Sequence, residues 1–156
     1  MADEFRRIIA NLWNSLGLSS PKLRPEGTTT LTVDGLELKL ALTEDERHIA
    51  VSCKAGRLSA NPTLMDEQIT RLLTSHLRTL PHNRACCWLD DQDSQTPVVV
   101  VQAISPCNPA AMDRLVGTIG DVAHLAGEYS RELGGRAAEP RAPNESLPDD
   151  MVIFRP

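Results

Sequence analysis

The sequence predicts an α+β domain in which three helices accompany one antiparallel sheet, in the order α-β-β-β-α-β-β-α. Apolar residues recur at the 3.6-residue helical spacing in three segments and alternate with polar residues in the segments between them. The pair Asp34-Gly35 separates two alternating segments, and such a pair is typical of a tight hairpin. With 156 residues, of which 41% are apolar, the chain is long enough for one sizeable core and not for two.

The first helix is expected over residues 3–16. Its apolar residues recur at helical spacing and form one stripe: Phe5, Ile8, Ile9, Leu12, Trp13 and Leu16. Asp3 and Glu4 lie where the positive end of the helix dipole favours acids, and Gly17 can adopt the left-handed conformation that ends a helix.

Three antiparallel strands are expected next, at residues 28–33, 36–42 and 49–55. In each of them apolar residues alternate with mostly polar neighbours. Asp34-Gly35 forms the first turn because both central positions of that turn type favour positive φ, and the charged residues 44–47 form the second.

The middle helix is expected to begin at Asn61-Pro62, since the asparagine can cap the first turn and proline suits the first helical position, and to end before Pro81. Two further strands follow at residues 84–89 and 98–103. The final helix runs from Asn108-Pro109 to Leu133.

The chain divides into a domain at residues 1–133 and a C-terminal tail at residues 134–156. The tail is rich in Pro, Ala, Arg and Glu, a composition typical of a mobile segment. It carries three arginines and four carboxylates, a net charge of -1, so that -4 of the total of -5 belongs to the domain.

Composition argues against binding to nucleic acids or to anionic membranes, because both need a basic protein face. No apolar run is long enough to span a membrane, and the N-terminus lacks the charge and apolar order of a signal peptide. We therefore expect a cytoplasmic protein.

The sequence contains no motif for catalysis or for cofactor binding, and we expect no enzyme, no cofactor and no metal site. The acidic residues of segments 44–46 and 90–93 are interpreted as solvated turns, because the spacing of a calcium loop is missing. His76 is the most ambiguous of the four histidines, at the edge of the apolar stripe of the middle helix. The four cysteines are interpreted as free thiols in or near the core.

Three helices are few for a five-stranded sheet, so part of an apolar strand face is expected to be left for a partner. The alternating leucines of residues 36–42 and the strand containing Trp88 are the best candidates for this surface.

The order of several segments resembles the class I chaperones of bacterial type III secretion, the Tir-chaperone-like group. The similarity spans residues 3–133 and includes Leu16-Gly17-Leu18, the strand and turn Leu31-Thr32-Val33-Asp34-Gly35, the motif Gly56-Arg57-Leu58, the leucine-rich middle helix and Trp88-Leu89-Asp90. This resemblance implies a homodimer without enzymatic activity. Such a dimer holds the N-terminal region of a secreted effector extended and delivers it to the secretion ATPase.

The resemblance also implies two surfaces. The first helix and first strands would bind the effector, here through Phe5, Trp13, Leu31, Val33, Leu38 and Leu40. The middle helix and the fourth strand would form the dimer interface, here through Leu73, Leu77, Cys87 and Trp88. The alternative is a non-enzymatic regulatory module of similar fold, in which protein binding serves regulation rather than export.

Overall fold

The computed structural model describes residues 2–24, 27–79, 83–91 and 96–134. The elements are α1 (Ala2–Ser15), β1 (Thr28–Val33), β2 (Leu36–Leu42), β3 (His48–Arg57), α2 (Pro62–Thr79), β4 (Cys86–Asp90), β5 (Val98–Pro106), a 3-10 turn (Pro109–Ala111) and α3 (Met112–Glu132). The predicted fold class and element order are therefore confirmed. The expected C-terminal tail lies, apart from Gly134, outside the described residues.

The five strands form one antiparallel sheet in the order β1-β2-β3-β5-β4, which makes β1 and β4 its two edges. The turn between β1 and β2 has positive φ at both central residues, 50° at Asp34 and 78° at Gly35, as its sequence predicts. In β3 the register shifts between Lys54 and Gly56, and such an irregularity bends a strand and increases its twist.

Two neighbouring rows of register partners cross the whole sheet and differ in chemistry. One row is apolar and its side chains lie on the core face of the sheet: Leu31, Leu38, Cys53, Val101 and Cys87. The next row is mostly polar and its side chains lie on the opposite face, which we call the open face: Thr30, Lys39, Ser52, Gln102 and Cys86. None of the open-face row is buried, because successive side chains of a strand point to opposite faces.

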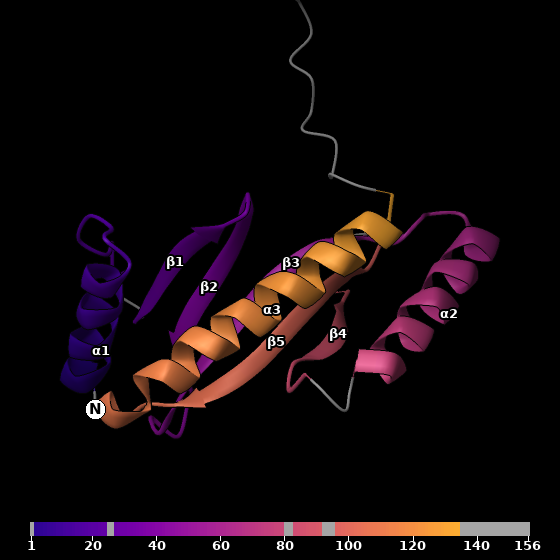
Figure 1. Cartoon of the computed structure of the whole chain (residues 1–156). Coiled ribbons are helices and arrows are strands. Elements are labelled where there is room, and N and C mark those ends of the chain that lie inside the picture. Colours follow the sequence, from indigo (N-terminus) through magenta and orange to yellow (C-terminus); the bar gives the residue numbers. More distant parts are fainter. Residues whose placement is uncertain (1, 25–26, 80–82, 92–95, 135–156) are drawn as a thin grey trace, which may run out of the picture.

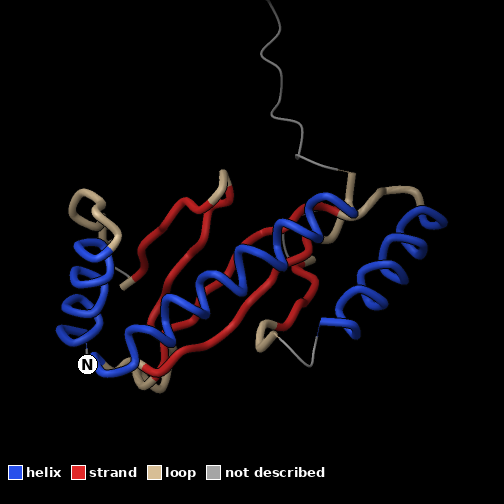
Figure 2. The backbone as a smooth tube through the Cα atoms, in the orientation of Figure 1, coloured by secondary structure: helices blue, strands red, loops and turns tan. Residues whose placement is uncertain are grey.

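Helix α3 lies diagonally across the sheet and covers the core face, while α1 lies beside β1 and α2 beside β4 (Figure 1). The side chains of α3 that face the sheet are fully buried: Leu115, Val122, Leu125, Ala126 and Tyr129 among them. Phe5, Ile8 and Leu12 of α1 complete the same core. The smooth trace in Figure 2 shows the same arrangement, in which the helices gather around the sheet without enclosing it.

Helix α2 is held to the rest of the domain by few buried groups. Leu72 is its only buried residue within the described chain. One hydrogen bond joins it to α3, with 2.7 Å between His76 Nδ1 and the hydroxyl oxygen of Tyr129, a side chain with no exposed surface. The helix begins as predicted, since the Asn61 side chain accepts a hydrogen bond from the Thr63 N–H at 3.0 Å. The contact between His76 and Tyr129 is therefore one of the few that fix α2, together with Leu72 and the half-buried Met65 and Ile69 that pack on the core.

Replacing Tyr129 with phenylalanine tests this contact. The change leaves the ring in place but removes the hydroxyl, so the half-buried His76 loses its partner, and we expect a loss of about 1–2 kcal/mol in the free energy of unfolding. The measurement is urea denaturation of the Tyr129→Phe variant. In a His76→Leu background the same change is expected to cost clearly less. An equal cost in both backgrounds would show that the hydrogen bond does not hold the helix.

Candidate functional site

The side chains expected to bind an effector lie mostly in the core. Five of the six are buried: Phe5, Trp13, Leu31, Leu38 and Leu40. Val33 is half-buried. The physical reason is that the chain's own helices α1 and α3 cover the apolar strand face that was expected to remain partly open. The expectation of an exposed surface made from these residues is therefore corrected. The same elements expose other groups instead: Leu16 and Leu18 after α1, and the edge of β1.

The edge of β1 offers main-chain hydrogen-bonding groups. The segment before β1 covers only its beginning, where the Arg24 N–H donates to the Thr28 carbonyl at 2.8 Å and the Thr29 hydroxyl donates to the Lys22 carbonyl at 3.2 Å. Because main-chain groups alternate in direction along a strand, those of Thr30 and Thr32 point away from β2, as that of Thr28 does. This edge can accept an added strand.

The side chains expected at a dimer interface fall on two sides of the sheet. Leu73 and Leu77 lie one turn apart on the outer side of α2 and are 54% and 67% exposed. Cys87 lies on the core face of β4, whereas Trp88, 45% exposed, lies on the open face. Leu89 lies on the same face of β4 as Cys87, and its exposed fraction of 45% equals that of Trp88. The alternation along β4 identifies Leu89, which the sequence reasoning missed.

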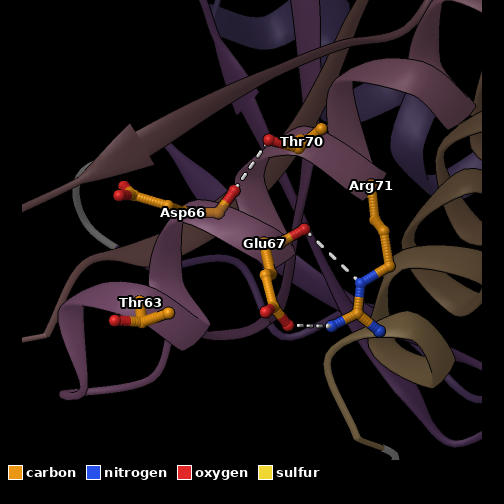
Figure 3. A pocket seen from close by; sticks show the side chains of 5 residues that line it. All are labelled: Thr63, Asp66, Glu67, Thr70 and Arg71. Atoms are coloured by element: carbon orange, nitrogen blue, oxygen red, sulfur yellow. Dashed lines mark hydrogen bonds and ion pairs between the residues drawn. The ribbon is translucent and has the colours of Figure 1, made fainter.

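A hollow on α2 is a plain helix surface rather than a binding site. Its lining comes from this one helix: Thr63, Asp66, Glu67, Thr70 and Arg71 (Figure 3). The polar groups satisfy one another, since Thr70 donates to the Asp66 carbonyl at 2.8 Å and Arg71 lies 3.9 Å from the Glu67 carboxylate. The hollow shows that no other part of the described chain covers this side of α2.

A groove of about 450 Å³ crosses the open face and is lined by residues from every strand. We call it the open-face groove. Trp88, Val100 and Lys54 are successive register partners on β4, β5 and β3, and they place an indole ring, an isopropyl group and an ammonium group side by side. Lys39 on β2 and Arg24, in the loop before β1, line its other side.

The described residues that line the open-face groove include three cations, Arg24, Lys39 and Lys54, and two carboxylates, Glu37 and Asp90. Together these described side chains carry a charge of +1, in a chain whose net charge is -5. Within the described ranges none of the three cations forms an ion pair. Such a groove favours a ligand that combines negative charge with apolar groups.

The thiols and His76 do not form a catalytic arrangement. Burial raises the pKa of Cys53 to about 11, and it also raises the pKa of Cys87 and of Cys107, so these thiols are poor nucleophiles. The partner of His76 is the Tyr129 phenol, whose pKa burial also raises, and no carboxylate contacts this histidine in the described part of the chain. Three thiols are buried or half-buried as predicted, but Cys86 is exposed.

The acidic turns show no metal site. Over residues 2–24, 27–79, 83–91 and 96–134, no three metal-ligating side chains come together. At the tip between β2 and β3, the Thr43 hydroxyl and the Arg47 N–H donate hydrogen bonds to Asp45 and lower its pKa to about 2. These bonds close the turn. Asp93 lies outside the described residues.

No helix within the described ranges is long and apolar enough to cross a membrane. At the level of sequence, no protein-family model matches the chain, and no curated protein matches it significantly. Proteins of similar fold are found by comparison of structures.

Three solved structures illustrate this similarity. A chain of the HopA1–SchA chaperone–effector complex superposes with a TM-score of 0.65 at 13% identity, over 83% of this chain and 95% of the other. A chain of the ExsC–ExsE complex gives a TM-score of 0.64 at 20% identity, over 85% and 96%. YbjN of E. coli, a putative transcription regulator, gives 0.56 at 18% identity, over 78% and 87%. The chain has the fold of the class I type III secretion chaperones, which YbjN shares.

Proposed function

We propose that this protein is a cytoplasmic chaperone of type III secretion that binds the N-terminal region of effector proteins, keeps it extended and export-competent, and delivers it to the secretion ATPase. The observation that carries the proposal is the edge strand β1, preceded in the chain by the exposed Leu16 and Leu18, on a fold shared with a chain of a chaperone–effector complex. An edge strand binds an extended segment through main-chain hydrogen bonds, whatever the sequence of that segment.

The proposed effector surface consists of the β1 edge together with Leu16 and Leu18. Both leucines are more than two-fifths exposed, and they lie in the chain between the end of α1 and β1. An added strand would pair with Thr30 and Thr32 through its main chain, and we propose that its apolar side chains contact these leucines. A segment held in this way cannot fold by itself, because its main-chain groups and apolar side chains are already engaged. Binding energy alone performs this work, so no nucleotide, metal or catalytic residue is needed.

The proposed active form is a homodimer. The outer side of α2 presents Leu73 and Leu77, and β4 presents Leu89 next to the half-buried Cys87. Exposed leucines on an uncovered helix and an edge strand favour a partner that buries both. A second copy suits this surface, since the symmetric interface of a homodimer uses the same patch twice. Trp88, on the opposite face of β4, would lie at the margin of this interface.

The alternative is a non-enzymatic regulatory module. YbjN, which is described as a putative transcription regulator, supports this alternative because it has the same fold. The two functions differ in the partner: an export chaperone binds an unfolded N-terminal segment, whereas a regulatory module binds a folded protein.

A charge on the outer side of α2 tests the dimer. Leu77→Asp removes apolar area on both copies at once, and at about 1.5–3 kcal/mol per buried leucine the dissociation constant is expected to rise at least about a hundredfold. Size-exclusion chromatography with light scattering measures the mass. Leu64→Asp is the matched control, because Leu64 lies on the same helix, is 48% exposed and points to the opposite side. A dimer that survives Leu77→Asp, or one lost equally in the control, contradicts the proposed interface.

Whether the protein binds an N-terminal segment or a folded part of its partners is tested with secreted proteins of the native bacterium. Each protein co-purified with the full chain is divided into an N-terminal segment and the remaining folded part, and both are assayed for binding by calorimetry. The N-terminal segment alone is expected to bind and to stay sensitive to protease outside the contact region. Binding confined to the folded parts would favour the regulatory module instead.

The strand-addition surface is tested at Thr30. Thr30→Pro removes an N–H that points away from β2, so the sheet keeps its own hydrogen bonds while an added strand loses one and meets the proline ring. Thr30→Ala changes the side chain but keeps the N–H. We expect binding of the N-terminal segment to weaken about tenfold in the proline variant, which corresponds to about 1.4 kcal/mol, and to stay near wild type in the alanine variant. Equal affinities in the two variants would mean that β1 does not accept a strand.

A further inference from the structure

We propose that the open-face groove is the binding site of the chain's own C-terminal segment, residues 149–154. This inference is independent of which partner the β1 edge binds. It rests on the chemistry of the open-face groove, on the sequence of the segment, and on the point where the tail leaves the domain.

The chemistry of the segment complements that of the open-face groove. Asp149 and Asp150 are followed directly by Met151-Val152-Ile153-Phe154, so two carboxylates precede four apolar side chains. The open-face groove combines positive charge with an apolar surface. Its cations are Arg24, Lys39 and Lys54, which form no ion pairs within the described ranges, and they lie next to the exposed ring of Trp88. Nowhere else in the sequence does an acidic pair precede four consecutive apolar residues that include an aromatic ring.

The tail leaves the domain on the core face, beside the end of β3 and two residues beyond Lys54, so it passes around the end of the sheet to reach the open-face groove. Leu133, after the end of α3, packs on Gly56: its Cδ1 atom lies 3.0 Å from the position that a β-carbon on Gly56 would occupy. Gly56 is two residues beyond Lys54 in β3. The backbone at Gly134 has φ 108°, a conformation that lets the chain change direction after α3.

The length of the tail is sufficient. Residues 135–148, fourteen in number, separate the domain from the segment, and an extended chain of this length spans up to about 46 Å. The five strands of the sheet together span only about 19 Å. A short tether gives an effective concentration of the order of 1 mM. A segment with an intrinsic dissociation constant of about 1 mM therefore occupies the open-face groove about half of the time.

Tethering is the reason to assign the open-face groove to this segment rather than to a separate acidic peptide. A free ligand of equally weak affinity would need a millimolar concentration to compete with the tail. A separate ligand of this face therefore has to compete with the tethered segment.

The test uses the fluorescence of Trp88 in the full chain. Trp13 is buried, so acrylamide quenches mainly Trp88, and a Trp88→Phe variant gives the background. In the double variant Asp149→Lys/Asp150→Lys the segment is released, and the accessible fraction of Trp88 is expected to roughly double, as for a site that was half occupied. The reversal Lys39→Glu/Lys54→Glu should have the same effect. Combining both pairs of changes should restore the wild-type value.

The control is Glu139→Lys/Glu145→Lys, which alters the charge of the tail equally but outside the segment, and it should leave the quenching unchanged. The measurements are repeated in the Leu77→Asp background and on dilution. The proposal is overturned if releasing the segment leaves Trp88 unchanged, or if the control changes Trp88 as much as the test. It is also overturned if the protection of Trp88 disappears on dilution, since a second copy or its tail would then be the occupant.

Discussion

The burial of one face of the sheet beneath α3 is the contact on which the other features of this structure depend. Leu115, Val122 and Leu125 have almost no exposed surface, and they meet strands whose core-face residues are equally buried. Since α3 and part of α1 supply this cover, little of the described chain remains for the opposite face, and the segment before β1 covers only the beginning of that edge. The open-face groove, the β1 edge and the uncovered side of α2 all follow from this one-sided packing.

The elements of this fold could be predicted because each one is encoded locally. Alternation, the Asp34-Gly35 turn and the two Asn-Pro helix starts are signals within a few residues, and the structure contains every element they indicate. Which strand face the helices would cover is not a local property. The apolar side chains of β1 and β2 look the same in sequence whether they meet α3 or a partner. Leu31, Leu38 and Leu40 were therefore expected on a surface and lie in the core.

The candidate surfaces also could not be predicted from local sequence patterns alone. Helical spacing places Leu73 and Leu77 in the apolar stripe of the middle helix, and the family resemblance alone assigns them to an interface; in the structure both are exposed. The family resemblance assigns Cys87 and Trp88 to one interface, although adjacent residues of a strand point to opposite faces. The bond between His76 and Tyr129 joins residues 53 positions apart, and the open-face groove joins all five strands. Contacts of this range exist only after the sheet order is known.

The exposure of Cys86 gives this protein a chemical property that its other cysteines lack. Its thiol lies on the open face of an edge strand and contacts the Gln102 carbonyl at 3.4 Å, while Cys53, Cys87 and Cys107 are shielded and have raised pKa values. A maleimide probe therefore has one preferred attachment point on the natural chain. Because that point lies on β4, spin labels or fluorophores placed there would report the distance between the two copies of the proposed homodimer without any engineered cysteine.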